Sequence, residues 1–138
     1  MKLAASLMLC TLALAFAQST GVIIPDLAKA KWTHEANDPP GAESIFLRQD
    51  EKTGGMDLLV RYAPGQKLQP HWHSVNERLI LLEGKVTVRA GDGPETTLVP
   101  GAFTFVPARE AHRLSCVSDT RCTFYIAWDG KLDSHKVQ

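Results

Sequence analysis

The chain has 138 residues, the length of one domain, and its 15 basic and 15 acidic side chains give a formal net charge of zero. This balance, without any block of like charge, gives no electrostatic reason to expect a nucleic acid or an anionic membrane surface as a partner. We therefore expect a single domain that binds neither nucleic acid nor membrane.

The first 17 residues have the pattern of a cleaved signal peptide. Lys2 supplies a positive charge, the run from Leu3 to Phe16 is almost continuously apolar, and Ala15 to Ala17 matches a small-x-small cleavage site. The alternative is a membrane anchor, but a membrane span needs about 20 apolar residues, and this run is shorter. We expect a signal peptide over residues 1–17 and a periplasmic or secreted mature chain that starts at Gln18.

The rest of the chain predicts an N-terminal arm, an all-β domain and a tail. Residues 18–42 read as the arm because prolines and a glycine near its end break any long element. Residues 43–130 alternate short apolar runs with turn residues, which is typical of strands. The expected strands are Ser44–Arg48, Met56–Tyr62, Leu68–His73, Arg78–Leu82, Lys85–Arg89, Thr96–Val99, Phe103–Val106, His112–Cys116 and Cys122–Trp128. Residues 131–138 are polar, which is typical of a loose C-terminal tail.

Three of these runs also predict which side chains are buried. The run from Leu79 to Leu82 is apolar on both faces, which predicts a strand covered on both sides. Phe103 and Phe105 share one face, and we expect them to pack inside the domain. Trp72 lies between two histidines, so alternation turns it away from them, toward packing in the wall or a subunit contact.

The cysteines support export. Cys10 would leave with the signal, and Cys116 and Cys122 remain as an even pair. We expect them to form a disulfide across a hairpin with its tip near residues 118–120, because secreted domains form such bonds. The alternative is two unpaired buried thiols or a minor metal site.

Four side chains are candidate ligands of a divalent metal ion. Alternate residues of a strand share a face, so His71 and His73 point the same way. A short turn then returns Glu77 from the start of the next strand, and a second turn returns His112. Imidazoles and a carboxylate on one interior face form a grip for a divalent metal ion.

Some of these side chains also have plainer interpretations. His112 alone would be read as a hydrogen-bonded core histidine, and Glu77 could pair with Arg78 or Arg113. Arg109, close to His112, is either a contact for an anionic substrate at the mouth of a pocket or a solvated turn residue. The sequence leaves the role of Arg109 open.

These segments resemble the two motifs of the cupin superfamily. Gly65 to Gly84 matches G-x5-H-x-H-x3-E-x6-G without a mismatch. The second motif, G-x5-P-x-G-x2-H-x3-N, keeps three fixed positions, Gly101, Pro107 and His112. The chain departs from it at Arg109, where the family usually has Gly, and at Cys116, where it has Asn. The resemblance runs from about residue 43 to residue 128 and is to compact, single-domain bacterial cupins.

The resemblance implies a jelly-roll β-barrel that holds one divalent transition metal ion with three histidines and one glutamate. Fe, Mn, Ni, Zn, Cu and Co are candidates, and the ligands would be His71, His73, Glu77 and His112. It also implies a homodimer. Four protein ligands leave one or two positions for water, O2 or substrate. We therefore expect a metal-dependent enzyme acting on a small molecule, of the dioxygenase or the isomerase/lyase type. The alternatives are a non-catalytic periplasmic module that binds metal or a small ligand, and a structural domain that merely keeps the site.

Overall fold

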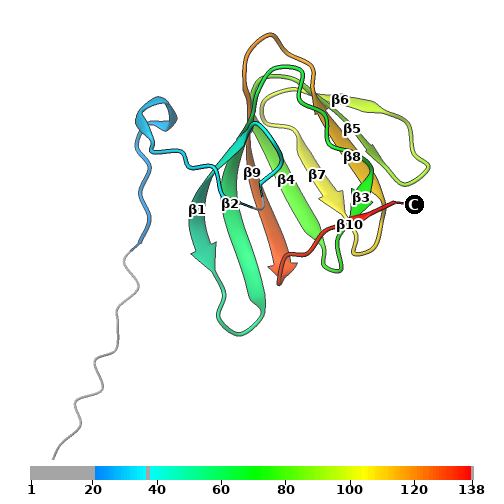
Figure 1. Ribbon diagram of the computed structural model, residues 1–138, viewed down its shortest axis with the longest axis horizontal. Helices are drawn as coiled ribbons and strands as arrows, with labels where there is room; N and C mark the ends of the chain where they lie inside the picture. The colour runs from blue at the N-terminus through cyan, green and yellow to red at the C-terminus, as the bar shows by residue number, and fades with distance from the viewer. Residues whose placement is uncertain (1–20, 37, 138) are drawn as a thin grey trace, which may run out of the picture.

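The computed structural model describes residues 21–36 and 38–137 (Figure 1). The signal peptide predicted for residues 1–17 lies outside this range. In chain order the elements are η1 (Leu27–Lys29), β1 (Ala42–Gln49), β2 (Gly54–Tyr62), β3 (His71–Trp72), β4 (Glu77–Glu83), β5 (Val86–Ala90), β6 (Thr96–Leu98), β7 (Phe103–Val106), β8 (His112–Cys116), β9 (Cys122–Gly130) and β10 (His135–Lys136). Within the described residues, no helix has both the length and the apolar character that a membrane span requires.

The strands form two antiparallel sheets that face each other as a sandwich (Figure 1). Sheet A has the order β1-β2-β9-β4-β7, and sheet B has the order β10-β3-β8-β5-β6. From β7 onward each strand lies in the opposite sheet to the one before it. This arrangement fits the predicted jelly roll and confirms the all-β class. The predicted closed barrel is not reached, because the described strands make no hydrogen-bonded pairing between one sheet and the other.

The predicted strands lie close to the observed ones, with one clear exception. The run predicted as Leu68–His73 contributes only the two residues of β3. Pro70 has no N–H to donate to a neighbouring strand, which limits pairing before His71. The preceding Lys67 makes only an isolated bridge to Ser115.

The outer face of β4 is partly exposed, which corrects the expectation for this strand. Leu79 and Leu81 point into the sandwich and are 2% and 0% exposed, whereas Ile80 between them is 36% exposed. Burial on this outer face varies from one strand to the next, since Leu59 in β2 and Ala127 in β9 are 7% and 3% exposed. A run that is apolar on both faces therefore does not by itself show that both faces are buried.

Phe103 and Phe105 lie on the outer face of β7, which corrects a second expectation. They are 57% and 49% exposed. The register pairs Phe103 with Ile80 and places Thr104 opposite Leu79, so that Thr104 takes the inward position. Alternation correctly placed the two phenylalanines on one face, but the long-range register decided that this face points outward.

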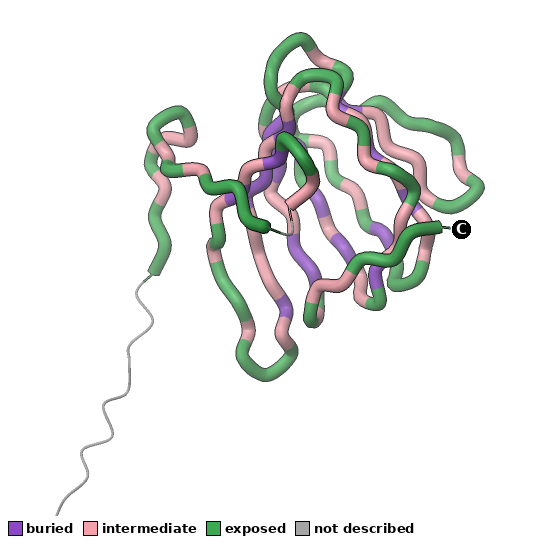
Figure 2. Tube along the Cα trace, in the orientation of Figure 1, coloured by how far each residue is buried: buried purple, intermediate pink, exposed green. Residues whose placement is uncertain are grey.

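One end of the sandwich is a closely packed core. Leu81 and Val86 are 0% exposed, and beside them the rings of Tyr62 and Phe124 make an edge-to-face contact with centroids 5.0 Å apart. Figure 2 shows buried segments on strands of both sheets. These residues come from both sheets, so their burial holds the two layers together.

The predicted disulfide is confirmed, but its setting differs from the predicted hairpin. Cys116 and Cys122 are bonded, with Cα atoms 5.8 Å apart. Cys116 ends β8 in sheet B, whereas Cys122 begins β9 in sheet A. The bond therefore links the two sheets across a crossover between layers.

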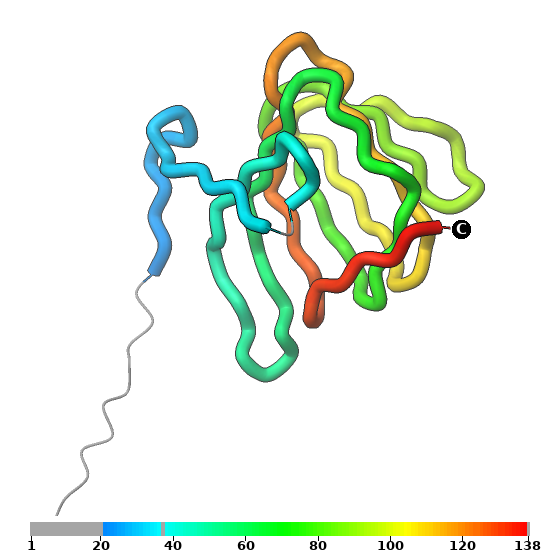
Figure 3. The backbone as a smooth tube through the Cα atoms, viewed as in Figure 1, coloured from blue at the N-terminus to red at the C-terminus, as the bar shows by residue number. Residues whose placement is uncertain are grey.

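The polar C-terminal segment is ordered against the domain, which corrects the expectation of a loose tail. After β9 the chain leaves sheet A, and β10 pairs with β3 in sheet B (Figure 3). His135 stacks on Trp72, with ring centroids 4.0 Å apart and planes 16° apart. Trp72 thus faces away from the neighbouring histidines, as alternation predicts.

Candidate metal centre

A cavity of about 310 Å³ lies between the two sheets. Most of its wall is apolar and comes from both layers, as Leu58, Leu79 and Ile126 in sheet A and Val88 and Leu114 in sheet B show. All four predicted ligands, His71, His73, Glu77 and His112, also line it. The side chains picked out in the sequence therefore meet in one mainly apolar cavity.

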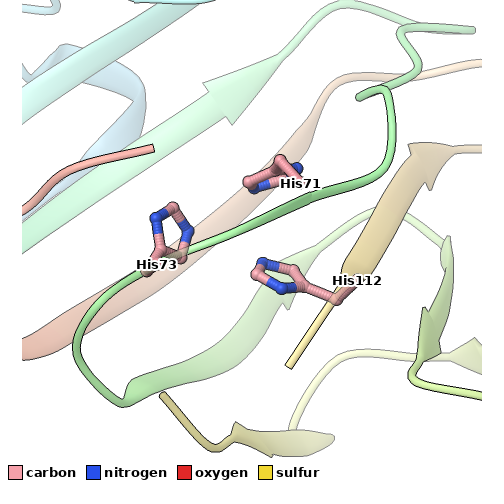
Figure 4. A group of neighbouring side chains, drawn as sticks. All are labelled: His71, His73 and His112. Carbon is pink, nitrogen blue, oxygen red and sulfur yellow. The ribbon is translucent and has the colours of Figure 1, made fainter. Parts of the chain in front are cut away.

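The three histidines point toward one another inside this cavity (Figure 4). His71 lies in β3, directly across from His112 in β8, and their ring centroids are 4.3 Å apart. His73 follows two residues after His71, on the same face. One ligand nitrogen from each ring lies within 4.8 Å of the others, a spacing that one metal ion can bridge.

Hydrogen bonds behind the rings fix the orientation of all three imidazoles. The Nδ1 atoms of His71, His73 and His112 contact the backbone carbonyls of Gln69 (2.8 Å), Asp133 and Glu110 (3.1 Å), respectively. A carbonyl can only accept, so each Nδ1 carries the proton and each neutral ring keeps a lone pair on Nε2. The Nε2 of His73 is buried, and its polar neighbour is the Glu77 carboxylate, which lies close to it without hydrogen-bond geometry.

Glu77 adds a carboxylate beside two of these rings. Its Oε2 lies 3.0 Å from the Nε2 of His73 and 3.7 Å from the Nε2 of His112. The indole N–H of Trp128 donates to the same oxygen at 3.1 Å. Glu77 opens β4, paired with Trp128 in β9, so the sheet itself brings this hydrogen bond about. Trp128 is a site residue that the sequence analysis missed.

The charges of the cluster follow from burial and from mutual contacts. Burial lowers the pKa of His71, which favours its neutral form. Burial acts in the same direction on His73, but the Glu77 carboxylate and the Asp133 carbonyl outweigh it and raise the pKa of that ring. Burial would raise the pKa of Glu77, but His112 and His73 outweigh it and lower that pKa to about 2. At neutral pH the cavity therefore contains one carboxylate among imidazoles.

Two turns hold the ligand-bearing segments in place. The turn between β3 and β4 is fixed by Asn76, whose amide donates to Asp129 at 2.8 Å and whose carbonyl oxygen accepts from the backbone of Ala108 at 2.9 Å. The backbone N–H of Arg109 donates to the carbonyl of His73 at 2.7 Å. The segments that carry His73 and His112 are thus tied to each other.

Arg109 contributes its backbone to the site. Its side chain is exposed and is not part of the cavity wall, so the structure offers no support for the substrate contact considered from the sequence. Its φ of 68° lies in the left-handed region, which explains why a glycine suits this position of the motif. Arg109 therefore contacts the site only through its backbone N–H, which donates to the carbonyl of His73.

The C-terminal tail also belongs to the site, and the sequence analysis did not find it. Leu132, Ser134 and Lys136 line the cavity. Asp133 binds the other side of His73 through its carbonyl, and its carboxylate accepts from the backbone of Ser74 at 2.7 Å. Alternation over residues 132–136 was the available signal, but a two-residue strand is too short to stand out by pattern.

Comparisons with known proteins agree with this fold. A protein-family model described as a cupin domain matches residues 58–128, just over half of the chain. The curated protein "DNA damage-repair/toleration protein DRT102" of Arabidopsis thaliana is 29% identical over 112 residues, which cover 80% of this chain and 34% of that protein. The chain thus spans about a third of the length of this relative.

Solved structures share the fold at low sequence identity. The polyketide cyclase RemF from Streptomyces resistomycificus superposes with a TM-score of 0.67 at 18% identity, covering 85% of this chain and 86% of RemF. An oxalate oxidase superposes with a TM-score of 0.66 at 17% identity, covering 91% of this chain and 68% of the oxidase. At these identities the likeness concerns the fold, and the chemistry has to be argued from the site.

Proposed function

Because the chain belongs to the cupin domain family, we propose that it is a metal-dependent enzyme that acts on a small molecule. One divalent transition metal ion would be held by His71, His73, Glu77 and His112. The observation that carries the proposal is the set of three Nδ1–H groups bound to backbone carbonyls, which leaves three Nε2 lone pairs free for one ion. Hydrogen bonds behind metal-bound histidines have this orienting role in metalloproteins.

The donor set fits a transition metal. Imidazole suits Zn, Cu, Fe and Ni, and a carboxylate also suits Mn, so these five metals are the candidates. Bound here, such an ion would supply Lewis acidity or, if redox-active, reactivity toward O2. The chain itself orients the ligands through Gln69, Glu110 and Asp133, and it surrounds them with a mainly apolar wall.

The reaction class we propose is that of a dioxygenase or an isomerase/lyase. Enzymes that use O2 and enzymes of the lyase type both occur on this fold, since an oxalate oxidase and a DMSP lyase share it. The alternative is a non-catalytic module that binds metal or a small ligand. Oxygen uptake and product analysis of the metal-loaded chain separate them: turnover supports the enzyme, whereas ligand-induced thermal stabilisation without turnover supports the module.

Metal analysis of the purified mature chain tests the site. We expect about one transition metal ion per chain in the wild type and its loss in His112→Ala. His34→Ala is the matched control, because His34 is exposed and lies outside the cavity. A wild type that folds but takes up no transition metal at neutral pH, or a His112→Ala variant that keeps it, would refute the proposal.

Glu77→Gln tests the carboxylate separately. Glutamine keeps the size of the side chain and an acceptor for the Trp128 indole but removes the negative charge. We expect metal affinity, measured by competition with a chelator, to fall by at least about tenfold. Unchanged affinity would remove Glu77 from the ligand set and leave a three-histidine site.

We also propose that the chain is exported and forms a homodimer. The apolar run from Leu3 to Phe16, with its cleavage pattern, supports export, and so does the Cys116–Cys122 disulfide, a bond of oxidising compartments. N-terminal sequencing of the protein recovered from periplasm or medium should start at Gln18. Sedimentation analysis should give twice the chain mass, and a monomer would refute the dimer.

A further inference from the structure

We propose that the ligand of the cavity is a small, mainly apolar molecule with an anionic oxygen group, and that Lys136 receives this group at the cavity mouth. This proposal rests on the metal site proposed above and adds the chemical class of its ligand. It assigns the C-terminal segment a role in specificity. The arguments come from the wall of the cavity, from its size and from the placement of Lys136.

The wall favours an apolar body. Side chains such as Leu58, Leu79, Val88, Leu114 and Ile126 surround the space beyond the histidines. A hydroxyl group moved from water against such a wall without a hydrogen-bond partner weakens binding. A sugar-like ligand would incur this cost for several hydroxyl groups, whereas an aromatic or branched aliphatic body would gain by leaving water.

The size of the cavity limits the ligand. Its volume of about 310 Å³ is at the lower end of the range for small-molecule pockets. This leaves room for a ligand of on the order of ten to twenty non-hydrogen atoms. A diacid of a few atoms would leave most of the apolar space unfilled, and a polymer chain would have to remain outside.

Lys136 supplies a positive charge where such a ligand would enter. The register pairs Lys136 with His71, so both side chains lie on the same face of sheet B, and both line the cavity. Among the described residues, no carboxylate lies within ion-pair distance of the Lys136 ammonium group. Two other residues of the C-terminal segment hold it in place. Asp133 accepts a hydrogen bond from the backbone of Ser74, and His135 stacks on Trp72.

Two carboxylates, Glu77 and Asp38, also line the cavity. The Asp38 carboxylate accepts hydrogen bonds from the backbone of Glu35 at 2.9 Å and from the hydroxyl of Ser44 at 3.3 Å. The Lys136 ammonium group and a bound divalent cation together carry three positive charges against these two negative ones, so that a net positive charge remains. A ligand with one anionic oxygen group therefore matches the charge of the cavity.

Calorimetric titration of the zinc-loaded mature chain tests the proposal with three probes that have equal numbers of non-hydrogen atoms. They are 2-naphthoate, its neutral counterpart 2-naphthamide and the polyhydroxylated acid D-glucuronate. Benzoate and octanoate extend the set of apolar acids to other shapes. The titrations are repeated on Lys136→Gln, with Lys131→Gln as the control, because Lys131 lies on the same segment but outside the cavity wall.

We expect at least one apolar acid to bind about tenfold more tightly than D-glucuronate, and 2-naphthoate to bind more tightly than 2-naphthamide. Lys136→Gln should remove the advantage of naphthoate over naphthamide, while Lys131→Gln keeps it. The ligand class is overturned if glucuronate binds as well as the apolar acids, or if none of the three apolar acids (naphthoate, benzoate and octanoate) binds. The role of Lys136 is overturned if Lys136→Gln keeps the preference for naphthoate.

These outcomes are separate from the fate of the proposed function. Zinc uptake, measured in the same samples before titration, reports on the metal site alone. A chain that takes up zinc but prefers glucuronate loses the ligand class and keeps the metal centre. If the chain takes up no zinc, the proposed metal centre is refuted. The role of Lys136 is then tested by the binding of naphthoate to the metal-free protein and to its Lys136→Gln variant.

Discussion

The interior of the sandwich has a packed end and a hollow end, and the two are built in opposite ways. At the packed end Leu81, Val86 and Leu98 fill the space between the sheets and are 0% to 7% exposed. At the hollow end His71 and His112 face a cavity, and their ring N–H groups are bound from behind by backbone carbonyls. At the packed end the side chains fill the interior by contacting one another. At the hollow end the Nε2 lone pairs of the histidines face the cavity and accept no hydrogen bond from any described residue.

This difference indicates a division of labour within one small domain. The packed end holds the two sheets together by apolar burial and by the Cys116–Cys122 bond. The hollow end presents polar groups that would be costly if they met neither a ligand nor an ion. Substitutions at the packed end should therefore lower the free energy of unfolding and leave metal binding unchanged. Substitutions at the hollow end should weaken metal binding and leave the free energy of unfolding of the metal-free protein nearly unchanged.

The largest expected effect is that of Leu81→Ala at the packed end. Leu81 is 0% exposed, and truncating a buried leucine leaves a cavity that costs about 2–5 kcal/mol. Denaturant unfolding of the metal-free protein measures this loss, and metal content per folded chain should not change. Ile80→Ala is the matched control, because Ile80 is the outward neighbour on the same strand and should cost under about 1 kcal/mol. Equal losses for the two variants would contradict the one-sided burial of β4.

At the hollow end, His71→Ala should leave the unfolding free energy of the metal-free protein within about 1 kcal/mol of the wild type. The variant should instead lose the stabilisation that metal provides. A ligand that binds only the folded state at 100 times its dissociation constant adds about 2.7 kcal/mol. Thermal unfolding with and without zinc measures that gain. If zinc stabilised the His71→Ala variant as much as the wild type, the division between a packed end and a metal-binding hollow end would be contradicted.

The sequence predicts those features of the fold and the site that depend on the spacing of residues within one short segment. The shared face of His71 and His73, and the turns that return Glu77 and His112, follow from spacing within short segments, and the structure brings these side chains together. Trp128 was missed because its hydrogen bond to Glu77 depends on the pairing of β4 with β9, strands about 50 residues apart.

Two further misses have the same physical origin. Phe103 and Phe105 were correctly placed on one face, but the pairing of β7 with β4 determined that this face points outward. The disulfide was predictable from two cysteines in a chain expected to be exported. That it crosses from sheet B to sheet A was not, because the hairpin and the crossover share the same local sequence.

Removing the disulfide sharpens the comparison with a smaller effect. In the chain-entropy model, the short loop that Cys116 and Cys122 close contributes about 2 kcal/mol. The double variant Cys116→Ala with Cys122→Ala should lose about this amount and still bind metal. Reduction of the wild type with dithiothreitol is the control and should lower stability similarly. Loss of metal from the reduced protein, without unfolding, would show that the packed end also shapes the site.

The smallest expected effect concerns Asp129, which supports the hollow end from outside by binding Asn76 and Arg78. The Arg78 guanidinium, and then the Asn76 amide, lower the pKa of Asp129 from its ordinary value of 3.8. A lowered pKa in the folded state means that the carboxylate stabilises the protein above about pH 4 and that this contribution is lost as the pH falls through the lowered pKa.

Asp129→Asn should therefore be less stable than the wild type at pH 7, and the gap should narrow at pH 3. Because both partners of the ion pair are more than a third exposed, the gap at pH 7 should stay below about 1 kcal/mol. Metal affinity should fall by less than about tenfold, since the turn that carries Asn76 loosens while the ligands remain. Asp92→Asn, in the exposed turn after β5, controls for the change of charge. A difference in the free energy of unfolding that stays constant between pH 7 and pH 3 would mean that the Asp129 side chain acts through its shape. The negative charge of Asp129 would then have no part in supporting the hollow end.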